Sequence, residues 1–258
     1  MPLNWIDVTN LSFNTLLLLE RVQLSWFPGW LPEPDLALAL QVNPVVEWFL
    51  RHKCPDLNEW LDKVMLLVLD PPAEPERVRQ AEVAVLGKIE DLLVYVVDPA
   101  IYDALEFNNW DSVELTSLVD FAGKMVIDVG AGTGRLTLVA AEKAAAVFAV
   151  EPVANLRRYL KEKARENGFK NVYSVDGLIT DLPFPDGFAD ITMEGHVFGD
   201  FPEDEYQEMM RVTKPGGMVI LMGGGGQEGR QFLLSKGIQG APYEEPGAGT
   251  KGKFWLVR

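Results

Sequence analysis

A glycine-rich segment at residues 128–134 has the residue types and spacing of a ligand-binding turn. It reads Asp-Val-Gly-Ala-Gly-Thr-Gly and follows the short apolar run Met-Val-Ile. Glycines let the backbone turn sharply and let a ligand approach without obstruction by a side chain. A plain strand-to-helix turn would also account for them, so the segment alone does not identify a site. The candidate binding residues in it are Asp128, Gly130, Ala131, Gly132 and Gly134.

Two further acids stand at the expected ends of the next two strands. Glu151 is followed by Pro152, and Asp176 is followed by Gly177. A carboxylate at the first position can accept both hydroxyl protons of a ribose, and one at the second could accept from an adenine amine. Each acid alone is more often a helix cap or turn residue. Acids at the ends of three successive strands, however, indicate one binding edge, because open α/β sheets bind ligands there.

The glycine spacing distinguishes between cofactors. A dinucleotide fingerprint has glycine two and then three positions after its first glycine, which here requires glycine at position 135. Arg135 stands there instead. The spacing therefore disfavours an NAD-dependent oxidoreductase, which we keep as an alternative function.

With these motifs the chain resembles the class I, Rossmann-like methyltransferases that use S-adenosylmethionine. The resemblance covers roughly the last 150 residues, and its matching pieces are residues 126–135, 149–152, 175–177, 181–184, 186–187 and 214–217. It implies that the three glycines lie against the methionine portion and the sugar of the cofactor. It also implies that Glu151 holds the ribose, that Asp176 meets the adenine, and that the sheet has seven strands with an antiparallel last strand at residues 254–257.

The segment at residues 194–200 carries the candidate catalytic residue. It reads Glu-Gly-His-Val-Phe-Gly-Asp and lacks the signatures of enzymes that methylate base amines or cytosine carbon. A sulfonium methyl is already activated, so positioning of the acceptor can suffice. If the acceptor is a hydroxyl or thiol, His196 could take its proton, with Glu194 or Asp200 orienting the ring. The alternative is a histidine that only packs within the loop. Glu194 is also a candidate cofactor-binding residue.

Short apolar runs alternate with helical patterns through the second half of the chain. The expected strands are residues 125–129, 147–150, 172–175, 190–193 and 218–222, and the expected helices are residues 111–121, 135–143, 154–167 and 203–212. Such alternation predicts an α/β fold with an open, doubly wound, mostly parallel sheet. Residues 238–243 and 254–257 predict a closing antiparallel hairpin. We interpret the glycines at 223–226 as a loop; the alternative is an opening that admits an acceptor.

The first part of the chain has the apolar spacing of helices. The expected helices are residues 36–41, 44–53, 56–69 and 74–97, with Asp56 and Glu59 as a capping box. We expect residues 1–104 to form an all-helical region that helps to shape the acceptor pocket, and residues 105–258 to form the methyltransferase domain. Four of the seven tryptophans lie in the first fifty residues. They are either core anchors or an aromatic pocket lining.

Composition restricts the partners. The chain has 258 residues and a formal net charge of −15, which disfavours nucleic acid because phosphates are bound by cations. One cysteine and two histidines make a disulfide or a metal site improbable. The apolar run at residues 16–19 is too short to span a membrane, so we expect a cytoplasmic protein. The oligomeric state cannot be read from the sequence.

Together with these patterns, the resemblance implies transfer of a methyl group from S-adenosylmethionine to a small molecule, with a protein side chain as the second choice of acceptor. A catalytically silent S-adenosylmethionine-binding partner or regulator is an alternative, because its cofactor half would have the same sequence pattern.

Overall fold

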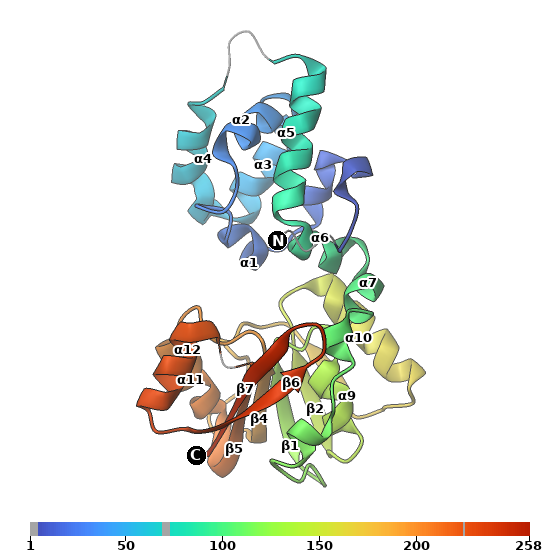
Figure 1. Cartoon of the computed structure of the whole chain (residues 1–258), viewed down its shortest axis with the longest axis vertical. Coiled ribbons are helices and arrows are strands. Elements are labelled where there is room, and N and C mark those ends of the chain that lie inside the picture. Colours follow the sequence, from blue (N-terminus) through green and yellow to red (C-terminus); the bar gives the residue numbers. More distant parts are fainter. Residues whose placement is uncertain (1–4, 69–72, 224) are drawn as a thin grey trace. The chain divides into compact units, whose positions relative to one another are not determined.

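The computed structural model describes residues 5–68, 73–223 and 225–258. The chain divides into two compact units, Met1–Tyr102 and Asp103–Arg258. The first unit is helical and the second contains the sheet (Figure 1). None of the described helices combines the length and the apolar character needed to cross a bilayer.

The first unit is built from helices around one apolar core. They are α1 (Arg21–Ser25), α2 (Glu33–Val42), α3 (Pro44–Lys53), α4 (Asn58–Met65), α5 (Pro75–Lys88), α6 (Glu90–Val97) and α7 (Pro99–Asp103), which ends in the second unit, together with short 3-10 turns. Leu24, Phe27, Leu36, Leu50 and Leu93 are among the fully buried core side chains. Trp30 and Trp60 pack against this core, whereas the Trp48 side chain is exposed and stacks on His52.

Two expectations for this unit are wrong. Residues 74–97 do not form one helix, because the chain leaves helical geometry at Ile89 (φ −120°, ψ 26°) and restarts as α6. Gly87 and the β-branched Ile89 are poor helix formers, and Ile89 is fully buried. The capping box does not form either. Asp56 lies in a 3-10 turn and pairs with Arg21 at 2.6 Å, and α4 begins after that turn. Residue 69, the expected end of this helix, lies outside the described residues.

The second unit contains a seven-stranded sheet of order β3-β2-β1-β4-β5-β7-β6. The strands are β1 (Met125–Val129), β2 (Ala146–Val150), β3 (Val172–Val175), β4 (Ala189–Gly195), β5 (Thr213–Gly223), β6 (Gln239–Glu245) and β7 (Gly249–Val257). The first five pair in parallel, and β7 is antiparallel to both of its neighbours. The predicted α/β fold and its closing hairpin are confirmed. The strand order reverses direction between β1 and β4, which is where doubly wound sheets bind ligands.

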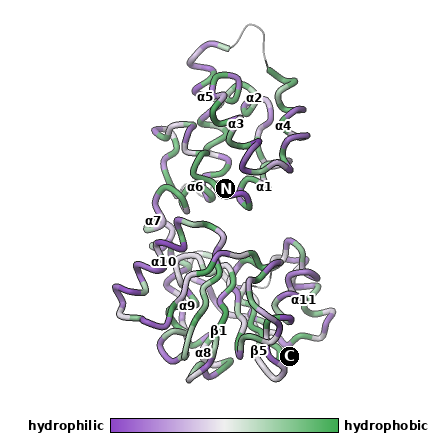
Figure 2. The backbone as a smooth tube through the Cα atoms, turned by 180° about the vertical axis from the view of Figure 1, so that it is seen from behind, coloured by the Kyte–Doolittle hydropathy of each residue, from purple (hydrophilic) through white to green (hydrophobic). Residues whose placement is uncertain are grey.

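Apolar side chains alternate between two buried faces of this sheet. On one face, Val126, Ile191 and Ile220 pack under α9 (Arg135–Ala141); on the other, Val219 and Leu221 pack toward α11 (Pro202–Val212) and α12 (Gly226–Ser235). Parallel strands covered on both faces have near-continuous apolar sequences. Figure 2 shows these strands as mostly hydrophobic and the outer helix α10 (Ala154–Glu166) as hydrophilic.

Two connections differ from expectation. The predicted helix at residues 111–121 is only α8 (Val113–Thr116), and the Asp120 side chain accepts from the backbone N–H of Ala122 in a later turn. Of the glycines at 223–226, which were expected to form a loop, Gly224 lies outside the described residues. Gly223 ends β5, Gly225 caps α12 with a left-handed φ of 66°, and Gly226 is the first residue of α12. The sequence pattern did not reveal this helix.

Candidate active site

The glycine segment forms a tight turn at the carboxyl end of β1. Gly130, Gly132 and Gly134 all have positive φ, between 54° and 96°. A Cβ at Gly130 would lie 2.3 Å from the Val197 side chain, and one at Gly134 would lie 2.3 Å from the Leu160 side chain. Both conformation and space therefore require glycine at these two positions.

Asp128 connects this turn to the helix that follows it. Its side chain is buried, and Oδ2 accepts a 2.5 Å hydrogen bond from the Thr137 hydroxyl on α9. Its other oxygen, Oδ1, is buried without a hydrogen-bond partner. Burial raises the pKa of the Asp128 carboxyl to about 7, and the nearby charge of Glu151 adds to the shift.

Glu151 holds the glycine turn against the end of β2. Its two oxygens accept 2.9 Å hydrogen bonds from the backbone N–H groups of Gly132 and Val153. Burial raises the pKa of this carboxyl to about 7, although both hydrogen bonds favour the anion. Asp176 lies at the end of β3 with a side chain 74% exposed, and its Oδ1 is 2.8 Å from Arg157 Nη1. The same guanidinium donates to the backbone carbonyl of Glu151, so it connects the two strand ends.

Glu194 is the buried acid at the end of β4. Its Oε2 accepts from the backbone N–H groups of Val197 and Phe198, at 3.0 and 3.3 Å, and its Oε1 is buried without a hydrogen-bond partner. Burial raises the pKa of the carboxyl to about 8, and the negative charges of Glu205 and Asp128 add to the shift. Because backbone bonds hold Oε2 and His196 lies against Glu245 instead, Glu194 does not orient the His196 ring as expected.

His196 is instead held by residues far away in the sequence. Its Nε2 lies 2.8 Å from Glu245 Oε1 and 2.8 Å from Arg135 Nη1. Arg135 and Glu245 form a buried ion pair at 2.6 Å. Burial opposes ionisation of Glu245, but His196 and Arg135 hold the pKa of its carboxyl at about 2. Among the described residues outside glycine, only His196 has a positive φ, 71°. Such conformations cluster at functional sites.

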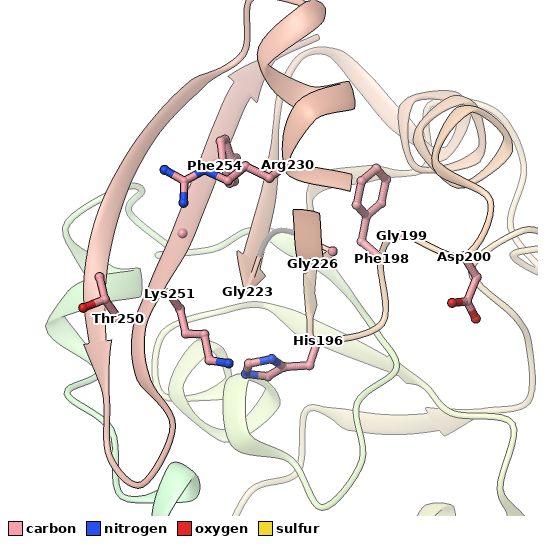
Figure 3. A pocket seen from close by; sticks show the side chains of 12 residues that line it. His196, Phe198, Gly199, Asp200, Gly223, Gly226, Arg230, Thr250, Lys251 and Phe254 are labelled. Carbon is pink, nitrogen blue, oxygen red and sulfur yellow. The ribbon is translucent and has the colours of Figure 1, made fainter. Parts of the chain in front are cut away.

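A pocket with a volume of about 380 Å³ opens beside His196 (Figure 3). It lies between the segment after β4, the end of β5, the start of α12, and strand β7. Its lining residues are His196, Phe198, Gly199, Asp200, Gly223, Gly225, Gly226, Arg230, Thr250, Lys251, Gly252 and Phe254. A Cβ at Gly223 would lie 2.9 Å from His196 Nδ1, so glycine leaves that ring nitrogen its space. His196 therefore contacts Arg135, the first residue after the glycine turn, and also lines the pocket.

Comparisons with known proteins identify part of the second unit. Residues 127–221 match the family model described as a methyltransferase domain. The chain is 33% identical over 105 residues to a demethylmenaquinone methyltransferase of Anoxybacillus flavithermus, and 31% identical to one of Geobacillus stearothermophilus. Each alignment covers 39% of this chain and 44 or 45% of the relative, so the chain spans less than half the length of these relatives. A methyltransferase structure from Aquifex aeolicus superposes with a TM-score of 0.48 and 20% identity, covering 62% of this chain and 98% of the other.

Residues 127–221 therefore carry a methyltransferase domain. Methyltransferases with this fold use S-adenosylmethionine, and the residues present fit that cofactor. It bears a sulfonium and an ammonium, and its amine and ribose groups are hydrogen-bond donors. Asp128 Oδ1 and Glu194 Oε1 are buried acceptors without donors, on carboxyls that burial has pushed toward the neutral form. A cationic ligand rich in hydrogen-bond donors would give both oxygens a donor and would favour the ionised form of both carboxyls.

Sequence reasoning missed the partners of the predicted base. From the sequence, Arg135 served only as an argument against dinucleotide binding, and Glu245 was not a candidate residue. Glu245 lies 49 residues after His196 and reaches it through the register of the β6–β7 hairpin. The one available signal was the position of Arg135 at the start of the helix after the glycine turn.

Proposed function

We propose that this chain transfers the methyl group of S-adenosylmethionine to a small molecule bound in the pocket beside His196. The observation that carries the proposal is the position of His196. It contacts Arg135, which follows the glycine turn, and it lines the pocket on its other side. The relatives are named as demethylmenaquinone methyltransferases, and such a substrate supports a small-molecule acceptor over a macromolecule.

The cofactor residues are part of the proposal. Gly130, Gly132 and Gly134 would lie against the methionine portion and the sugar, Glu151 would hold the ribose, and Asp176 would meet the adenine. Asp128 and Glu194 would accept from donors of the cofactor through their free oxygens. The remaining candidates of this cradle are Ala131, Pro152 and Gly177.

When bound, the cofactor supplies a methyl group already activated by a sulfonium. The chain has to place the acceptor and take its proton. His196 Nε2 lies 2.8 Å from both the Glu245 carboxylate, which can only accept, and the Arg135 guanidinium, which can only donate, so these contacts by themselves allow either tautomer. We assign the proton to Nε2, where it is donated to Glu245, while Arg135 pairs with the Glu245 carboxylate. This leaves a lone pair on Nδ1, the nitrogen beside Gly223 in the pocket wall. In our proposal, His196 Nδ1 accepts the proton of an acceptor hydroxyl or thiol, and Glu245 stabilises the resulting imidazolium.

The test uses methyl-labelled S-adenosylmethionine and a small-molecule extract. We expect label in small molecules, and a turnover about a hundredfold lower in the His196→Gln variant with S-adenosylhomocysteine affinity unchanged. His52→Gln, which removes the other histidine of the chain, is the matched control. Tight cofactor binding without transfer to any fraction would instead identify a catalytically silent binding protein.

A further inference from the structure

The walls of the pocket indicate which kind of acceptor it takes. Two cationic side chains reach the pocket from different elements, Arg230 from α12 and Lys251 from β7. Neither makes a hydrogen bond or ion pair with any residue in the described part of the chain. Neighbouring cations do have such partners. Lys253 pairs with Glu114, and Lys236 pairs with Glu203.

The charge of the pocket is opposite in sign to that of the chain. Arg230 and Lys251 stand against one lining acid, Asp200, in a chain with 38 acidic and 23 basic side chains. Figure 3 shows the Lys251 amine directed toward His196, with Arg230 farther along the same side and Asp200 across the pocket. Two unpaired cations that converge on one cavity favour an anionic ligand, particularly where the rest of the chain would repel it.

The remaining lining is poorly suited to an apolar ligand. Five lining residues are glycines, and Thr250 adds a hydroxyl. The two aromatic lining residues, Phe198 and Phe254, are 3% and 2% exposed, because their rings pack in the core beneath β5. An extended quinone would meet little apolar wall here. The volume of about 380 Å³ lies at the small end of ligand sites and suits a compact metabolite.

We propose that the acceptor is a small anionic molecule whose carboxylate or phosphate group is bound by Arg230 and Lys251. This inference rests on the proposed methyl transfer. Binding of the anion by two side chains on one side of the pocket would hold the nucleophilic atom of the acceptor near His196 Nδ1. Arg230 and Lys251 thus determine specificity and take no part in proton transfer.

The experiment separates the small-molecule extract by anion exchange into an anionic fraction and a neutral-plus-cationic fraction. Each fraction is offered to the full chain with methyl-labelled S-adenosylmethionine. We expect label in the anionic fraction. In the Arg230→Gln/Lys251→Gln variant, KM should rise tenfold to a hundredfold with S-adenosylhomocysteine affinity unchanged. Lys236→Gln, which removes a cation of α12 outside the pocket, is the matched control and should leave KM unchanged. Phosphatase treatment of the anionic fraction abolishes labelling if the group is a phosphate and spares it if the group is a carboxylate.

Failure of the inference is distinguishable from failure of the proposed function. Label confined to the neutral-plus-cationic fraction, or a KM that the double substitution leaves unchanged, overturns the anionic acceptor but keeps methyl transfer. If no fraction is labelled, methyl transfer fails, and calorimetry of the S-adenosylhomocysteine-loaded chain with inorganic phosphate and with succinate decides the inference. Binding that the double variant loses supports an anion site, and absence of binding to the wild-type chain overturns it.

Discussion

Replacing Glu194 with glutamine tests whether the ligand-free site holds neutral carboxyls. The Glu194 side chain is fully buried, its Oε1 has no hydrogen-bond partner, and its pKa is raised to about 8. A glutamine of the same shape can still accept from the backbone N–H groups of Val197 and Phe198. It differs from the native carboxyl chiefly in being unable to ionise.

The sign of the effect follows from proton binding. The unfolded chain releases the Glu194 proton near pH 4.5, whereas the folded chain keeps it until about pH 8. Between these values the folded state binds more protons, so the free energy of unfolding falls as pH rises. At roughly 1.4 kcal/mol for each pKa unit, the shift corresponds to a few kcal/mol. The Glu194→Gln variant avoids this loss and should gain on the order of a few kcal/mol relative to wild type between pH 5 and pH 9.

Urea unfolding from pH 5 to pH 9 measures this difference. The difference in the free energy of unfolding between variant and wild type should be small at pH 5, increase through neutral pH and level off above pH 8. Glu162→Gln, which neutralises an exposed acid on α10, is the control and should show no such widening. If the curves for Glu194→Gln and wild type run parallel across the whole range, the argument from burial is wrong.

Four further outcomes are expected. Glu151→Ala should weaken S-adenosylhomocysteine binding about tenfold or more in calorimetry, and Asp176→Ala should weaken it less because water can replace its 74%-exposed side chain. Binding of S-adenosylmethionine at pH 7 should release protons, measured by calorimetry in two buffers, and Glu194→Gln should reduce that release. Anisotropy titrations at physiological salt should detect no binding of DNA or RNA at micromolar protein, given the net charge of −15. A chain starting at Ala104 should bind the cofactor, since every candidate residue follows it, but lose methyl transfer if the helical region helps to select the acceptor; full transfer activity would refute that role.

The part of the site that could be predicted is the part encoded locally. Gly130 and Gly134 are required by the turn itself. Asp128, Glu151 and Asp176 come to one edge because consecutive parallel strands place their carboxyl ends together. These inferences need only the strand pattern and a topological rule, and the observed strand order brings these strand ends to one edge.

The remaining features depend on packing that no local pattern reports. The break at Ile89 places a buried side chain in the core of the first unit, and periodicity alone extends a helix through it. The pairing of His196 with Glu245 depends on the hairpin register. The sequence suggested Glu194 and Asp200, the acids nearest to His196, as its partners. Glu194 instead accepts from the backbone N–H groups that follow β4. Arg230 and Lys251 likewise line one pocket only through the position of α12 beside β7.

The left-handed backbone at His196 is stabilised by contacts of its backbone and of its ring. A non-glycine residue in this region costs roughly 1–2 kcal/mol, so surrounding interactions must hold it there. The His196 N–H donates to the Met222 carbonyl at 3.0 Å, and Nε2 lies against Glu245 and Arg135. Gly223 leaves room for the ring, since any Cβ there would lie 2.9 Å from Nδ1. These contacts oppose relaxation of the backbone to an ordinary conformation, which would take Nδ1 away from the pocket wall. The strain is therefore physically connected to the position of the proposed base.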